Sequence, residues 1–485
     1  MKVKVKSLAT ILRYGFVSIV ILSCNLPMLV SDSGDVDRGI VDSEDQASSQ
    51  SYWILAIGGE GRDYAPSFHE TEDGFVVVGM TSSYGFGDGG GNRDGSHDFL
   101  VVKLDKSGNH LWSRVIGGPG DERGSYSVRP AADSGFLLTG TTKSFGAGKT
   151  DMFIVKLKAN GDLDWSKAIG GTGAEAGMTT LETADGYIAL GDTDSFGAGK
   201  KDLLVVKLEP NGELAWAKTY GGIESDIGSG IAEVDGGYVI GGTIWSFGAG
   251  EADANAGLIK IDPQGDVIWA KTIGGSAGEG INWDGVRVTS DGGYSFGDKT
   301  ASFGAKGNGA LFGVKLNPDG ELEWSTMVDG PGEDVGWTMN ETEDGYIAGG
   351  KLTIPQHGGD VLIVKFDKDG NYLWSRIFGE AGLDEIEEIK PTEGGYIMAG
   401  VTRMIDPAGD FLVAKVDVEG FVGGDADPIM PLDPRSVVSI TPQVQPFSPK
   451  VTDVSALTSV ETIVPIVASP GIDIHEIHRN ETHPY

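Results

Sequence analysis

Cysteine is nearly absent from this sequence: Cys24 is the only one in 485 residues, so no disulfide can form within the chain. Basic residues are also scarce. The 37 Lys and Arg residues stand against 71 Asp and Glu residues, giving a formal net charge of −34, which argues against nucleic acid or an anionic membrane surface as partner. Heptad patterns are missing too. Glycine, by contrast, is abundant with 77 residues, and this favours many short strands joined by tight turns.

The N-terminal residues are typical of an export signal. Three lysines within the first six residues and Arg13 precede an apolar run over 14–22 that is too short to span a bilayer. The segment ending in Ser23-Cys24 resembles the lipobox of bacterial lipoproteins, which implies lipidation of Cys24, although Leu22 stands where a smaller residue is commoner. The alternative is an ordinary signal peptide with an incidental cysteine. We expect 1–23 to be removed and the mature protein to be lipid-anchored in the cell envelope or extracellular.

Two segments flank the central part of the chain. Residues 24–50 are rich in Asp and Ser and poor in apolar residues, which predicts an acidic flexible tether. Residues 425–485 contain many Pro, Val and Thr residues without periodicity, although Val460 to Val467 could form a strand that pairs with another part of the protein. We expect an extended C-terminal tail there.

Between these flanks, three markers recur seven times in the same order. One is a turn of an acidic residue and glycine followed by an aromatic residue, as in Asp73-Gly74-Phe75, with Ser134 inserted in the second copy, Asp133-Ser134-Gly135-Phe136. Another is a lysine that closes an apolar run: Lys103, Lys156, Lys207, Lys260, Lys315, Lys365 and Lys415. The third is a tryptophan at intervals of 50 to 59 residues: Trp53, Trp112, Trp165, Trp216, Trp269, Trp324 and Trp374.

Each repeat predicts four strands. The glycine of the turn supplies the positive φ of a tight hairpin, and the run before each lysine is apolar on both faces, as in a buried strand. Four strands in about fifty residues are typical of a propeller blade. The sequence therefore predicts an all-β, seven-bladed propeller over 51–424. Because no tryptophan follows Lys415, the strand carrying Trp53 should complete the last blade and close the ring.

The repeat resembles the propeller repeats of bacterial and archaeal surface lipoproteins. Its Gly-x-x-x-Trp element, as in Gly108-Asn109-His110-Leu111-Trp112, is similar to the tryptophan-docking motif of the quinoprotein-like repeat. That resemblance covers about 51–420 and implies that each indole packs against the next blade. It implies a fold and leaves the function open, because propellers include enzymes, scaffolds and sensors.

A carboxylate recurs at the start of each predicted innermost strand. These seven acids predict a ring around one mouth of the central channel, where they could bind a cation such as calcium. The alternative, which we favour, is that each carboxylate accepts backbone N–H bonds in its own turn or pairs with a repeat lysine. We therefore expect no cofactor and assign no metal ligand. The seven are Asp63, Glu122, Glu175, Asp226, Glu279, Asp334 and Asp384.

Residues that break the repeat are better candidates for a ligand site. Trp283 and Trp337 lie just after the acid ring on the innermost strands, near the equivalent Tyr126, and aromatic side chains beside a polar mouth suit sugar or peptide recognition. The alternative is that they plug the channel or fill gaps left by glycines. The first-blade loop over 88–98 partly matches a calcium loop, but Val101 stands where the final glutamate belongs, so a solvated loop is favoured.

No catalytic constellation is predicted, because the seven histidines lack metal-ligand spacing and no Ser/His/Asp grouping occurs. The sequence favours a non-enzymatic binding or scaffold module at the cell surface, monomeric, with an extracellular protein or glycan as ligand. The alternative is an extracellular enzyme that acts on a polymer such as a glycan, with its site at the channel mouth.

Overall fold

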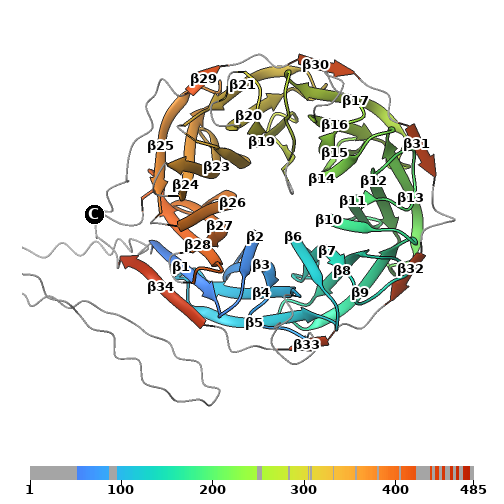
Figure 1. Ribbon diagram of the computed structural model, residues 1–485, viewed down its shortest axis with the longest axis horizontal. Helices are drawn as coiled ribbons and strands as arrows, with labels where there is room; N and C mark the ends of the chain where they lie inside the picture. Colours follow the sequence, from blue (N-terminus) through green and yellow to red (C-terminus); the bar gives the residue numbers. More distant parts are fainter. Residues whose placement is uncertain are drawn as a thin grey trace, which may run out of the picture.

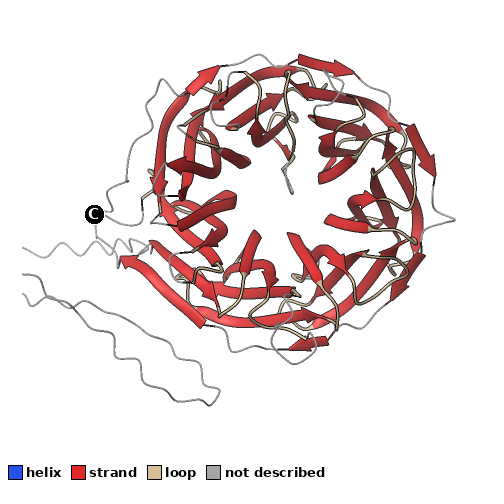
Figure 2. Cartoon of the chain, viewed as in Figure 1, coloured by secondary structure: helices blue, strands red, loops and turns tan. Residues whose placement is uncertain are grey.

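Strands account for the regular structure of the residues that the structure describes. The computed structural model describes residues 52–86, 96–247, 254–281, 285–303, 305, 309–330, 332–354, 358–379, 382–403 and 406–421, together with six short C-terminal strands between 437 and 480. No helix occurs in this part of the chain (Figure 2), and so none of its residues form a helix able to cross a membrane. The predicted signal peptide, Cys24 and the tether lie outside the described residues.

Five antiparallel blades surround a common axis, and in four of them the innermost strand is long (Figure 1). The first has β2 (Asp63–Thr71), β3 (Gly74–Thr81), β4 (Asp98–Asp105) and β5 (His110–Gly117). The second has β6 (Glu122–Pro130), β7 (Phe136–Thr142), β8 (Asp151–Leu157) and β9 (Leu163–Gly170). The third has β10 (Glu175–Thr183), β11 (Gly186–Thr193), β12 (Asp202–Leu208) and β13 (Leu214–Gly221). The fourth has β14 (Asp226–Val234), β15 (Gly237–Ile244), β16 (Asn255–Ile261) and β17 (Val267–Gly274). The fifth has β18 (Arg287–Val288), β19 (Tyr294–Thr300), β20 (Ala310–Leu316) and β21 (Leu322–Val328).

The last two repeats share one nine-stranded sheet. One part holds β22 (Val335–Thr342), β23 (Gly345–Ile354), β24 (Gly358–Asp367) and β25 (Tyr372–Phe378), and the other holds β26 (Gly382–Thr392), β27 (Gly395–Thr402), β28 (Asp410–Asp417) and β1 (Tyr52–Gly58). Two parallel residue pairs between β24 and β26 join the parts, because β24 extends to Gly358 and meets Gly382. The sequence predicted seven separate blades, whereas the structure divides the strands among six sheets. The N-terminal strand β1 pairs antiparallel with β28 from the end of the repeats.

The C-terminal tail adds an outermost strand to every sheet. Its strands are β29 (Val437–Ser439), β30 (Gln443–Pro446), β31 (Lys450–Asp453), β32 (Ser459–Thr462), β33 (Ile466–Ala468) and β34 (Asp473–Asn480). They pair antiparallel with β21, β17, β13, β9, β5 and β1 in that order, so the tail runs around the ring against the direction of the repeats (Figure 1). The sequence predicted an extended tail, and the tail's backbone groups here find partners in the blades.

The core lies between neighbouring blades. The third strand of each repeat is apolar on both faces, and residues such as Val101 and Val102 are fully buried. The ring of Phe99 on β4 packs against that of Phe153 on β8, with centroids 5.1 Å apart. Blade-to-blade contact therefore replaces the single central core of a smaller domain.

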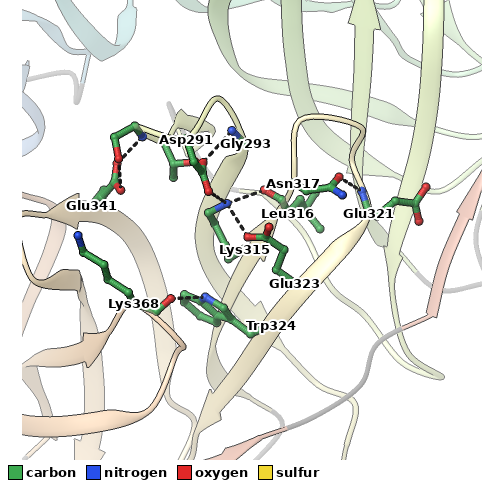
Figure 3. A network of polar contacts seen from close by, with 12 residues as sticks. Asp291, Gly293, Lys315, Leu316, Asn317, Glu321, Glu323, Trp324, Glu341 and Lys368 are labelled. Atoms are coloured by element: carbon green, nitrogen blue, oxygen red, sulfur yellow. Dashed lines mark hydrogen bonds and ion pairs between the residues drawn. The ribbon is translucent and has the colours of Figure 1, made fainter.

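Where a repeat tryptophan contacts a turn glycine, that glycine belongs to the following repeat, as Gly370 does for Trp324. The indole of Trp324 on β21 donates to the carbonyl oxygen of Lys368 at 3.1 Å (Figure 3). Gly370 in that turn has φ +78°, and a Cβ added there would overlap the Trp324 ring. Glycine is therefore needed both for the left-handed backbone and for the close approach of the indole.

Five repeat lysines tie a hairpin turn to the third strand by an ion pair with the turn aspartate: Lys103, Lys156, Lys207, Lys315 and Lys365. Lys315, which is buried, places its Nζ 2.9 Å from Asp291 and 2.8 Å from Glu323, and it also donates to the carbonyl of Leu316 (Figure 3). Burial alone would raise the pKa of Asp291, but the hydrogen bonds from Lys315 and Thr289 lower it to about 2. The lysine is thus a satisfied structural cation.

Candidate functional site

The seven repeat acids are buried inside their own blades. None of these side chains is more than 2% exposed. Glu122 accepts the N–H of Gly118 at 2.8 Å and the hydroxyl of Thr142 at 2.7 Å, and Asp226 accepts the N–H of Gly222 at 2.8 Å. These carboxylates therefore accept from the turns that precede them, which is the interpretation favoured from the sequence, because the turns leave backbone donors that need an acceptor.

The seven repeat acids do not gather at one point. In the described part of the chain no three His, Cys, Asp or Glu side chains lie close enough to share a metal ion. Burial raises the pKa of Asp63 to about 6 and that of Asp334 to about 6, even though both accept hydrogen bonds. Most of the predicted calcium loop over 88–98 lies outside the described residues. Its last member, Asp98, is buried and accepts the N–H of Phe86 at 3.0 Å.

One position of the repeat changes from glycine to aspartate. Six repeats have glycine four residues after the aromatic residue of the second strand: Gly79, Gly140, Gly191, Gly242, Gly350 and Gly400. At Gly79, Gly191, Gly242, Gly350 and Gly400 a Cβ would overlap a carbonyl oxygen of the innermost strand. Asp298 holds the same place on β19, because Thr300, two residues later, pairs with the repeat acid Glu279 as Thr193 pairs with Glu175. Because a side chain at this position would overlap the backbone of the innermost strand, that strand cannot pair closely with β19 beside Asp298.

The innermost segment of this blade is accordingly displaced. Among the residues that the structure describes here, this segment pairs with β19 only at Glu279 and along the two residues of β18. Ile281 instead turns to the neighbouring blade, where its N–H donates to the hydroxyl of Thr243 at 3.2 Å and its carbonyl accepts from Ser229. Val286 packs over Gly241 of that blade. The Gly-to-Asp change therefore coincides with a gap in the innermost layer.

A cavity of about 420 Å³, which we call the axial pocket, opens at this gap. Five charged side chains contribute to its lining: Glu279, Asp298, Lys299, Glu333 and Lys351. Thr243 and Trp337 add a hydroxyl and an indole. Lys299 forms an ion pair with Glu333, and Lys351 lies 3.7 Å from Glu385 of β26. The pocket therefore combines donors, acceptors and one aromatic surface.

A buried acid lies close to this pocket. Glu387 on β26 is 6% exposed, and burial, followed by the charge of Glu385, raises its pKa to about 8 in spite of a hydrogen bond with Tyr64. Asp298 adds to this effect, while Lys351 opposes it. Burial and Glu387 in turn raise the pKa of Tyr64 well above its usual value. At neutral pH, Glu387 therefore carries its proton.

The three predicted ligand residues have different surroundings. Trp337 on β22 lines the axial pocket. Tyr126 on β6 is only partly exposed, and burial raises its pKa. Its ring fills the space beside Gly124, where an added Cβ would overlap it. Trp283 lies outside the described residues. The structure places Trp337 in a cavity, and it places Tyr126 on another blade.

The sequence analysis missed the polar residues of the pocket. Asp298, Lys299 and Lys351 lie at the ends of second strands, and Glu385 and Glu387 lie on β26. A signal was present in the repeat, since Asp298 replaces a glycine that the six other repeats keep at the aligned position. The elevated pKa of Glu387 had no such signal, because its main cause is burial, which depends on packing between blades.

Comparison with known proteins gives no family. No family model matches the chain, and no curated protein matches it. A crystal structure of a protein assigned as a 6-phosphogluconolactonase from Bacteroides uniformis is similar to this chain at 13% identity and a TM-score of 0.32, covering 81% of this chain and 100% of that one. A GH43_12 protein from a capybara gut metagenome is similar at 8% identity and a TM-score of 0.26, covering 76% of this chain and 96% of that one. Likenesses of this size leave the function of the chain open.

Proposed function

We propose that this protein is an exported, non-enzymatic binding propeller that takes a hydroxyl-rich ligand, such as the end of an extracellular glycan, in the axial pocket. The observation that carries the proposal is the lining of this pocket at the point where the repeat is broken. Three carboxylates, two ammonium groups and a hydroxyl line the pocket together with one indole, that of Trp337. A residue that recurs in every repeat serves the fold, whereas Asp298 occurs once and accompanies a cavity.

The chemistry of the lining favours a sugar over an apolar ligand. Sugar hydroxyls both donate and accept, so they suit carboxylates such as Asp298 and Glu279 together with ammonium groups such as Lys351. The indole of Trp337 offers an apolar surface with a polar edge, which suits the C–H face of a sugar ring. The volume of about 420 Å³ falls in the range of small-molecule sites.

The finer architecture and the location of the protein belong to the same proposal. We infer that the nine-stranded sheet is two blades, β22–β25 and β26-β27-β28-β1, which brings the ring to seven. The basic and apolar N-terminus and Cys24 support export and lipid anchoring of a monomer, with the acidic segment over 24–50 as tether. An anchored propeller of this kind would present the axial pocket to extracellular polymers or proteins.

A glycan array probed with the mature chain carrying Cys24→Ser tests this function. Trp337→Ala should lower binding about tenfold or more, because it removes the apolar surface of the pocket. Trp245→Ala is the matched control, since Trp245 also breaks the repeat and does not line the pocket. Binding that survives Trp337→Ala unchanged, or no binding to any glycan, would overturn the proposal.

An enzyme acting on a glycan is the second candidate, and Glu387 is the observation that favours it. A carboxylic acid that is protonated at neutral pH can act as a general acid, and glycoside hydrolysis uses two carboxyl groups. Glu385 and Glu387 come from one strand beside the pocket-lining Lys351. Release of reducing ends from a bound glycan, lost in Glu387→Gln, would establish this function in place of the first.

A further inference from the structure

A second cavity lies away from the axial pocket. It measures about 760 Å³ and lies between the blade β2–β5 and the blade β6–β9, beside the hairpin turns that follow the innermost strands. We call it the turn groove. Glu72 and Asp73 of one turn line it together with Trp112 of β5, while Pro130 and Phe136 come from the next blade. The axial pocket lies at the other end of the innermost strands, where they begin.

The groove coincides with another break in the repeat. Glu182 of β10 reaches back to the preceding blade and accepts the turn N–H of Ala132 at 2.7 Å. Glu341 of β22 does the same with Ser290, accepting its N–H at 2.6 Å and its hydroxyl at 2.7 Å (Figure 3). Proline takes this place on β6 and again on β26, since Pro130 pairs with Phe136 and Pro391 with Tyr396 as Glu182 pairs with Tyr187. No carboxylate can therefore cross from Pro130 to the turn that carries Glu72.

Small or apolar side chains form the far side of the groove. Pro130 and Ala159 are exposed there, and Phe136 lies beneath them as a buried floor. Trp112 remains partly exposed, although its ring packs on Gly161 of the next blade. An aliphatic chain could lie along this surface and remove apolar area from water.

The near side of the groove is acidic. Three carboxylates, those of Glu70, Glu72 and Asp73, face one ammonium group, that of Lys103. Lys103 is buried and paired with Asp73 at 2.6 Å, and Glu70 accepts from Lys106. His69 adds no positive charge at neutral pH, because burial and then the charge of Lys390 lower its pKa to about 4. The lining therefore keeps a net negative charge beside an apolar wall.

We propose that the turn groove binds a lysine or arginine side chain on an extended segment of a basic protein partner. The aliphatic stem would lie over Trp112 and Pro130, and the cationic head would meet the carboxylates of Glu72 and Asp73. Long cationic side chains bury their stems along apolar surface while the head stays in a polar environment. This site is independent of the axial pocket and goes beyond the proposed glycan function.

Fluorescence anisotropy with a labelled peptide of alternating glycine and lysine tests the site. Pro130→Glu restores the residue type found on β10 and β22 and should close the groove, lowering affinity about tenfold. Ile223→Glu is the matched control, because it adds the same charge at a residue that is 76% exposed. Non-specific attraction to a chain of net charge −34 would strengthen binding equally in both variants, and that result would overturn the proposal.

A second comparison keeps the test decisive if Pro130→Glu does not fold. Glu72→Gln removes one carboxylate from the groove and should weaken the peptide several-fold, whereas Glu213→Gln, at an exposed turn elsewhere, should change nothing. The same peptide with acetylated lysines should lose affinity, because the head no longer carries charge. Equal binding of the acetylated peptide would refute the inference. Trp337→Ala should leave the peptide affinity unchanged, which separates this site from the glycan proposal.

Discussion

Glu387→Gln should stabilise the protein in a manner that depends on pH. Burial and the neighbouring Glu385 raise the pKa of Glu387 from 4.5 to about 8. A carboxyl group with a raised folded pKa binds its proton more tightly in the native state than in the unfolded state. Its contribution to stability is therefore most favourable at low pH. It is lost as pH rises from the unfolded value of 4.5 to the folded value near 8.

The size of this effect follows from the shift. One pKa unit corresponds to about 1.4 kcal/mol, so the buried acid costs about 3 kcal/mol at pH 7 and less than about 1 kcal/mol at pH 5. Glutamine keeps the shape and cannot ionise. The difference in unfolding free energy between Glu387→Gln and the wild type should therefore grow by about 2 kcal/mol between pH 5 and pH 7.

Urea unfolding followed by tryptophan fluorescence at several pH values measures this difference. Asp63 and Asp334, whose pKa values are also raised to about 6, act with the same sign in both proteins and cancel in the comparison. A difference in unfolding free energy that does not change with pH would reflect only the altered hydrogen bond to Tyr64, and it would refute the account of Glu387 as a buried, protonated acid. Glu343→Gln, at an exposed turn, is the control.

Four further outcomes are expected. Gly191→Ala should destabilise the fold by about 1–3 kcal/mol in urea, because its Cβ would overlap the carbonyl of Ala176; an unaltered midpoint would contradict the packing argument. Lys315→Met should lower stability at neutral pH, and the gap should narrow as pH falls toward 2, where Asp291 takes up its proton and loses its ion pair; a gap of constant size would count against it. Deletion of 437–485 should lower the melting temperature and promote association seen by light scattering, because it uncovers the outer edges of six sheets; a monomeric chain of unchanged melting temperature would contradict this. Asp298→Gly should leave the melting temperature equal or higher and abolish glycan binding on the array, since it removes a pocket carboxylate; retained binding would show that Asp298 takes no part.

The repeat allowed much of the fold to be predicted. Trp324, Lys315 and the Asp-Gly turns lie where their spacing placed them, because each acts within its own repeat or on the next one. The acids at the starts of innermost strands could also be located. The sequence also favoured backbone N–H bonds to these carboxylates, such as the one that Glu122 accepts from Gly118. Their nearly complete burial could not be predicted, since it depends on how the surrounding strands pack.

The candidate site was predicted only in part. Trp337 was identified as a residue that breaks the repeat, and it lines a cavity. Asp298 was missed, although its place in the repeat belongs to glycine elsewhere. Lys351 and Glu385 were missed because they come from different strands, and their side chains meet at 3.7 Å only when those strands are brought together.

The sequence by itself determined the strands, the turns and the propeller class, because these follow from local periodicity and from glycine at left-handed positions. The repeat count also predicted that β1 would complete the last blade, as its pairing with β28 confirms. Only the tertiary structure joined β24 to β26, placed β34 beside β1, and led the tail around the outer strands. It also determined the protonation of Glu387, whose pKa reflects burial together with Glu385, Tyr64 and Asp298 from three separate strands. Pairing partners and electrostatic environment depend on residues far apart in the chain, and no local pattern carries that information.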